Sequence, residues 1–168
     1  LNINPNAVIN SKSEHRATVH VDNTSTVVYE GIMNGHLHSI GSLSLLAGAV
    51  HGQVSSFTPF KLSGNAKIDV GIFLGRVDKY IGKICLTDPL RDKLDVLTGM
   101  GMEPEVGNPV LIAEGVDGYR LTKSDLSKLN CITDGCEFYL DNDCILTRKI
   151  DPSANEKIDP AQLRIRTG

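Results

Sequence analysis

Apolar and polar residues alternate through much of the first half of the chain. Residues 16–21 and 26–29 are two such runs, and an Asp-Asn-Thr-Ser turn at 22–25 separates them. Successive side chains of a strand point to opposite faces, so this alternation predicts two half-buried β-strands. The segments 43–45 and 61–68 have the same character and predict further short strands.

Three octets in this half share a spacing of glycines. After its first residue, each octet has Gly, two mostly apolar residues, any residue, a second Gly, any residue and an aliphatic residue. The octets are 30–37, 47–54 and 70–77. One coil of a parallel β-helix needs about as much chain as separates their starts, because its short strands alternate with turns.

Stacking the octets predicts which residues face the core of such a coil. The inward residues are Val50, Gly52 and Val54, with Met33, Gly35 and Leu37 beneath them and Phe73, Gly75 and Val77 above. The outward residues are His51, Gln53 and Arg76. The glycines then occupy positions where the coil is too narrow for a side chain. An alternative register sets residues 49–52 against residues 66–71 and fits nearly as well.

Two stretches of this repeat resemble a known family. L-S-L-L-A-G-A-V-H-G-Q-V at 43–54 and L-S-G-N-A-K-I-D-V at 62–70 are similar to the L-x-L-x-x-G-A-x-V-x-G-x-V coils of the bactofilins. These are bacterial cytoskeletal proteins whose central domain is a right-handed β-helix. The resemblance covers roughly residues 27–85 and implies a β-helical fold and a cytoplasmic location. Near Cys85 the pattern stops and helical signals replace it.

Two helices are expected in the second half. Pro89 at a first helical position and Gly99 just past the end predict a helix over residues 88–98. Its apolar face is formed by Leu90, Leu94 and Leu97. Thr122 followed by Asp125 resembles a capping box and predicts a short second helix.

Hairpins and termini complete the expected elements. The predicted hairpins pair 110–113 with 119–121 and 137–140 with 145–147. A last strand is expected at 162–167, and the Asn-rich first ten residues resemble an arm.

The fold class that follows is mainly β, with two short helices in the C-terminal half. We expect a parallel β-helix-like solenoid, with a β-sandwich or jelly roll as the alternative. The 168 residues fit one domain, 1–168, with a β repeat region at 16–85 and a mixed helix and hairpin region at 86–168.

Composition excludes several classes of protein. The chain is 40% hydrophobic and 22% charged, as in ordinary globular domains. No run of about 18 apolar residues is present to span a membrane. A net charge of -3 offers no cationic surface for nucleic acid. No P-loop or G-x-S-x-G nucleophile elbow occurs, so nothing in the sequence argues for an enzyme.

Histidines provide the candidate metal ligands. His36 and His38 lie on one face of a predicted strand, and His51 follows on the next coil. Imidazoles arranged in this way can converge on a divalent metal such as zinc. Polar surface histidines that bind no cofactor are the alternative. His15 and His20 have no evident partner in the sequence pattern.

The four cysteines leave the compartment open. Cys85, Cys131, Cys136 and Cys144 lack the C-x2-C spacing of a zinc site. Free thiols are the first interpretation, and one disulfide is the second. Paired cysteines would favour an extracellular or virion-surface location.

Two functions are compatible with these patterns. The first is a structural, self-assembling β protein that forms a homo-oligomer or polymer, because an uncapped coil presents unpaired backbone. The second is an extracellular recognition module, such as an adhesin, fibre or coat component, that binds a protein or carbohydrate ligand.

Overall fold

The computed structural model of the chain describes residues 8–10, 17–21, 26–29, 32–99, 101–102 and 104–150. Within them the protein is mainly β, with parallel and mixed sheets and one short helix. The strand expected at 162–167 lies outside the described residues.

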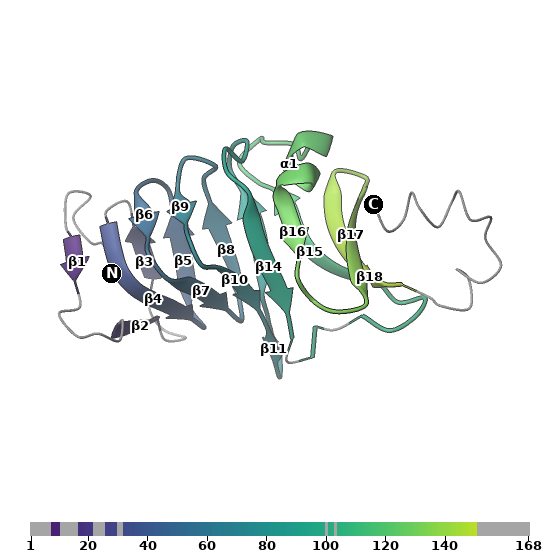
Figure 1. The fold of residues 1–168 in the computed structure, drawn as a ribbon, viewed down its shortest axis with the longest axis horizontal. Coiled ribbons are helices and arrows are strands. Elements are labelled where there is room, and N and C mark those ends of the chain that lie inside the picture. Colours follow the sequence, from purple (N-terminus) through teal and green to yellow (C-terminus); the bar gives the residue numbers. More distant parts are fainter. Residues whose placement is uncertain are drawn as a thin grey trace.

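The strands form three parallel ladders, which we call A, B and C. Ladder A contains β3 (Thr26–Tyr29), β5 (Ser42–Leu45), β8 (Pro59–Leu62), β13 (Lys83–Leu86) and β15 (Val110–Gly115). Ladder B contains β1 (Val8–Asn10), the start of β4 (Ile32–Ser39), β6 (Ala49–Val50) and β9 (Lys67–Ile68). Ladder C contains β2 (Ala17–Val21), the rest of β4, β7 (Gln53–Ser56), β10 (Gly71–Leu74), β14 (Leu94–Thr98) and β16 (Leu129–Cys131). In Figure 1 the strands lie side by side along the long axis.

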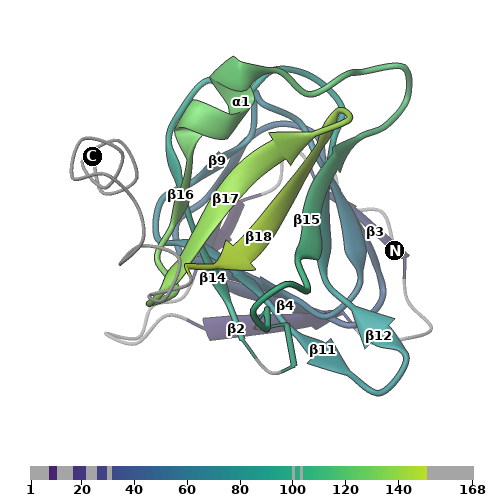
Figure 2. The same cartoon turned by 90° about the vertical axis from the view of Figure 1, so that its right-hand side faces the viewer.

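The chain visits the three ladders in the same order in successive turns. Strands β5, β6 and β7 make one turn, and β8, β9 and β10 make the next. Leu43 pairs with Phe60 in ladder A, and Val54 pairs with Ile72 in ladder C. Both pairs span nearly the same length of chain, so each turn repeats the one before it. Figure 2 shows the strands seen along this stack.

The core lies between the ladders. In β4 every second residue is buried, from Met33 to Ser39. Leu62, Leu86 and Val96 are fully buried and belong to the same hydrophobic cluster. Apolar side chains thus stack on their counterparts in the next turn, and the area they remove from water stabilises the fold.

Serine side chains form bends between the strands. The hydroxyl oxygens of Ser39, Ser56 and Ser63 accept from the backbone N–H two residues on, at 3.2, 3.3 and 3.1 Å. Each hydroxyl replaces a backbone acceptor and so stabilises a tight turn. All three serines are buried, which places these bends close to the core.

The first two octets stack as predicted, and the third does not. Met33 pairs with Val50 and Leu37 pairs with Val54, which confirms the inward positions of these residues. Val54 is fully buried, as expected. Val77 is 41% exposed instead of buried, so its predicted core position is wrong. The alternative register, which sets residues 49–52 against residues 66–71, agrees better with the structure, because Ala49 pairs with Lys67.

A hairpin explains the shift of the third octet. The antiparallel strands β11 (Arg76–Val77) and β12 (Tyr80–Ile81) follow β10 and, among the described residues, pair only with each other. They extend away from the stack in Figure 2. The chain therefore leaves ladder C after Leu74, and Ile72 and Leu74 take the inward positions. Phe73, which was expected to face inward, is half-buried.

The helix predicted over 88–98 is wrong. Residues Leu94–Thr98 form β14, which pairs parallel with β10. Leu90 and Leu94 are buried as expected, but Leu97 is half-buried. The leucine spacing favours a helix, but helix propensity contributes little free energy. Strand pairing in ladder C and the burial of Val96 and Thr98 outweigh it.

Elements outside the repeat cover the C-terminal end. Strands β17 (Cys136–Asp141) and β18 (Cys144–Lys149) form the predicted second hairpin, which continues ladder A in antiparallel fashion through β15. Helix α1 (Lys123–Lys128) begins at the predicted capping box of Thr122 and Asp125.

Two local expectations from the sequence are wrong. Residues 119–121 form no strand, since β15 pairs with β13 and β18, so the first predicted hairpin is wrong. Val8–Asn10 forms β1, which pairs with β4, where an arm was expected. In both places a partner distant in sequence decides the structure, which local turn signals do not reveal.

The stacking of Gly52 on the turn below gives a test of the repeat. A Cβ atom at Gly52 would clash with the backbone carbonyl of Gly35. We expect Gly52→Val to lower the free energy of unfolding by about 3 kcal/mol, because the core is overpacked. Gln53→Val, on the outward side, should change it by less than about 0.5 kcal/mol. Urea denaturation measures both, and the opposite order of damage would contradict the stacking.

Candidate functional site

The three histidines proposed as metal ligands have separate partners. The Nδ1 atom of His36 accepts a hydrogen bond from the backbone N–H of Gln53 at 3.0 Å. The Nδ1 atom of His51 lies 3.0 Å from a carboxylate oxygen of Asp69. Among the described residues, no group of three or more His, Cys, Asp or Glu side chains is placed to hold a metal ion. A zinc site made by His36, His38 and His51 together stays a prediction.

His38 instead lies beside His20. Strands β2 and β4 pair in register, with His20 opposite His38, and the two ring centroids are 5.3 Å apart. The ring of Phe57, which is 6% exposed, lies 5.2 Å from the ring of His38. Burial, and then the neighbouring His20, lower the pKa of His38. The sequence pattern assigned His20 no partner. Paired residues of β4, β7 and β10 in ladder C are separated by a nearly constant length of chain, and the same separation counted back from His38 leads to His20.

All four cysteines are free in the structure, in agreement with the first interpretation. Cys85 is 7% exposed and stands between Lys61 and Glu114 in ladder A. Burial raises the pKa of the Cys85 thiol and of the Cys131 thiol. A protonated thiol is a poor nucleophile, so neither residue has the character of a catalytic cysteine.

A buried carboxylate links three segments at the C-terminal end. Asp125, in α1, is 1% exposed, and its Oδ1 atom accepts from the backbone N–H of Leu90 at 3.1 Å. Its Oδ2 atom accepts from the Tyr119 hydroxyl at 2.5 Å and from the Thr122 N–H at 3.0 Å. Lys128 returns to the same turn, donating from Nζ to the Leu90 carbonyl oxygen at 3.0 Å. Because a buried carboxylate must be fully hydrogen-bonded, these contacts fix α1 against the turn that precedes β14.

A groove lies beside the β11–β12 hairpin. Its volume is about 550 Å³. Its lining consists of Pro59, Ile81, Pro109, Val110, Leu111, Lys79 and Lys83. Ile81 is 41% exposed, and Lys83 is paired with Glu114 at 2.8 Å. An insertion into a repeat often carries a binding surface, and a groove lined mostly by apolar residues suits an apolar partner surface.

The outermost strands of the three ladders at the N-terminal end are β1, β2 and β3. Within the described part of the chain, each pairs on one side only. Unpaired strand edges present N–H and C=O groups that a further strand can bind. This end of the stack is therefore a candidate assembly surface, which we call the N-terminal edge.

The backbone N–H and C=O groups of Val28, in β3, point outward at the N-terminal edge. The Ser63 N–H donates to the Leu45 carbonyl oxygen at 2.9 Å, so the peptide groups of Leu45 face β8. Alternate residues of a parallel strand bond to opposite neighbours, so those of Ser44 face β3. Val28 stands opposite Ser44, and its own N–H and C=O consequently point away from β5.

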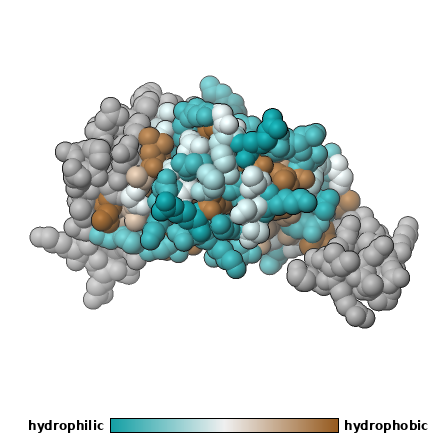
Figure 3. Space-filling model, turned by 90° about the horizontal axis from the view of Figure 1, so that it is seen from above, coloured by the Kyte–Doolittle hydropathy of each residue, from teal (hydrophilic) through white to brown (hydrophobic). Residues whose placement is uncertain are grey.

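The face in Figure 3 is mainly hydrophilic, with apolar residues in separate small groups. The described residues contain no helix long and apolar enough to cross a membrane. No family model, curated protein or solved structure matches the chain.

Loss of the buried carboxylate should destabilise the fold. We expect Asp125→Ala to lower the free energy of unfolding by about 3 kcal/mol, since the Leu90 N–H and the Tyr119 hydroxyl lose a charged acceptor. Asp95→Ala is the control, because Asp95 is exposed and accepts one bond from Asn130. Chemical denaturation of both variants is the measurement, and equal effects would show that the Asp125 contacts are unimportant.

The same contacts predict a dependence of stability on alkaline pH. Burial, and then the hydrogen bond to Asp125, raise the pKa of Tyr119 from 10.0 to about 12. A group with a raised folded pKa contributes stability that is complete below the unfolded value and is lost as pH rises through the folded value. The free energy of unfolding should therefore fall between pH 10 and about 12, and Tyr119→Phe should show a smaller fall over that range. Denaturation curves at several pH values test this, and identical slopes for the two proteins would refute it.

Proposed function

We propose that the chain is a parallel β-solenoid with a structural role, and that it assembles with copies of itself into an oligomer or polymer. The observation that carries the proposal is the N-terminal edge, where all three ladders end on strands paired on one side among the described residues. An added strand could continue the hydrogen bonding of each ladder, as edge strands in general allow.

Two features support a solenoid over a β-sandwich or jelly roll. The ladders pair parallel strands from successive turns, whereas sandwiches and jelly rolls are built from antiparallel strands. Counterparts are separated by nearly equal lengths of chain, as Leu43 is from Phe60 and Val50 is from Ile68, which repeating coils require.

The two ends of the stack differ, and this difference favours one assembly surface. At the C-terminal end ladder A passes from parallel strands into the antiparallel β17–β18 hairpin, and α1 directly precedes β16, the last strand of ladder C. Repeat proteins commonly end in such atypical elements. Assembly through the N-terminal edge alone would join two chains into a dimer, the smallest of the proposed oligomers, and a polymer would need a second contact surface.

The resemblance to bactofilins agrees with a structural role, and with it a cytoplasmic location is expected. Both proposals rest on the repeat in residues 43–54 and 62–70.

A recognition module for a protein or carbohydrate is the second candidate, and the groove beside β11–β12 is the observation that favours it. Its apolar lining and the exposed Ile81 would suit a partner surface. A chain that stays monomeric, and whose binding to a glycan or protein is lost in Ile81→Asp, would favour this alternative.

Assembly is tested by a proline at the edge. Val28→Pro removes an N–H that points away from β5, so the ladder within the chain should persist while addition of a strand is blocked. We expect light scattering to show assemblies for the natural chain and a monomer for Val28→Pro with a similar melting temperature. Val28→Thr keeps the N–H and should assemble normally. A monomeric natural chain at all concentrations would refute the proposal.

A further inference from the structure

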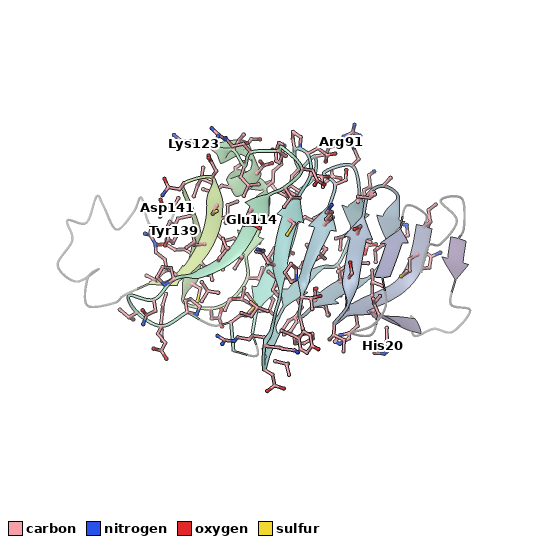
Figure 4. All side chains as sticks on the ribbon, turned by 180° about the vertical axis from the view of Figure 1, so that it is seen from behind. His20, Arg91, Glu114, Lys123, Tyr139 and Asp141 are labelled. Atoms are coloured by element: carbon pink, nitrogen blue, oxygen red, sulfur yellow. The ribbon has the colours of Figure 1, made fainter. Side chains whose placement is uncertain are left out.

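The outward face of ladder C pairs two imidazoles on neighbouring strands. His20 is exposed on β2, and His38 is half-buried directly opposite it on β4. Figure 4 shows His20 at the surface of the stack, far from Tyr139 and Asp141 on the C-terminal hairpin. The pair thus lies away from the C-terminal hairpin.

The spacing of the two rings matches shared coordination of one ion. In a tetrahedral zinc site with Zn–N bonds of about 2.0 Å, two imidazole ring centres are about 5 Å apart. The centroids of His20 and His38 are separated by 5.3 Å, and their planes are inclined by 61°.

The surroundings hold one of the two ligands in place. Phe57 packs on His38 at 5.2 Å and packs in turn on Phe73 at 6.1 Å. Both histidines lie on strands joined by ladder pairing, and sites built on such elements keep their geometry better than sites on loops. Rigid support reduces the conformational entropy lost on binding.

We propose that His20 and His38 bind a divalent transition-metal ion, with Zn²⁺ as the ion of choice and water completing the coordination. Imidazole is a preferred ligand of such ions, and a two-histidine site leaves positions open for water or for a ligand from elsewhere. The site differs from the one expected from sequence, because His20 takes the place of His36 and His51. It does not depend on the proposed assembly of the chain.

Calorimetric titration of the full chain with zinc chloride, at neutral pH, is the primary test. We expect one equivalent of Zn²⁺ to bind, and His20→Ala or His38→Ala to weaken binding at least about tenfold, since each removes a direct ligand. His51→Ala is the matched control and should bind as the natural chain does, because His51 is engaged with Asp69. His20→Ala is the safer variant for folding, since its side chain is exposed.

A second measurement locates the ion. On addition of Zn²⁺, the imidazole nitrogen resonances of His20 and His38 should shift together, and those of His51 should stay unchanged. Absence of binding would overturn the proposal, as would binding that survives both alanine variants. Loss of binding in His51→Ala would also overturn it, and would favour the group of His36, His38 and His51 instead.

Discussion

Hydrogen bonding between successive turns is the constraint on which the rest of this structure depends. Each strand must meet its counterpart in the turn before it, so the chain has to return to the same ladder after a nearly constant length, as from Leu43 to Phe60 or from Val54 to Ile72. Once the register is set, alternate side chains are committed to the core or to the surface. Gly52 illustrates how little room this leaves, since a Cβ there would meet the backbone carbonyl of the turn below.

Where the chain between two paired strands is longer than one repeat, the extra residues lie outside the ladders. Two such insertions contain the groove and the buried carboxylate of Asp125. The path from Phe60 to Ile84 is longer than the path from Leu43 to Phe60, and the β11–β12 hairpin borders the groove in this interval. The still longer path from β14 to β16 contains α1 and the Asp125 network. Insertions are tolerated because the strands that flank them keep their partners, and the loops themselves add little entropic cost.

Much of the repeat could be predicted from sequence, because its signal is local. Alternation at 42–45 and the glycines at 48 and 52 mark one turn, and the capping box at Thr122 marks the start of α1. The failures share a different cause. Leucines at 90, 94 and 97 fit a helix when taken alone, and only pairing with β10 makes Leu94–Thr98 a strand. His20 likewise lies opposite His38 only because of the register between β2 and β4, which no local motif specifies.

The outward faces of the ladders are where such a fold can acquire chemistry without loss of stability. An inward position is bounded by side chains of the turns above and below, as Val54 is by Leu37 and Ile72, and tolerates little change in volume. An outward position has the same fixed neighbours across the ladder, and His20 shows that it can be exposed to solvent. The distance between strands alone brings His20 and His38 together. A parallel stack therefore supplies pairs of side chains at metal-binding distance as a consequence of its register, and substitution of one outward residue in one turn is enough to create or remove such a pair.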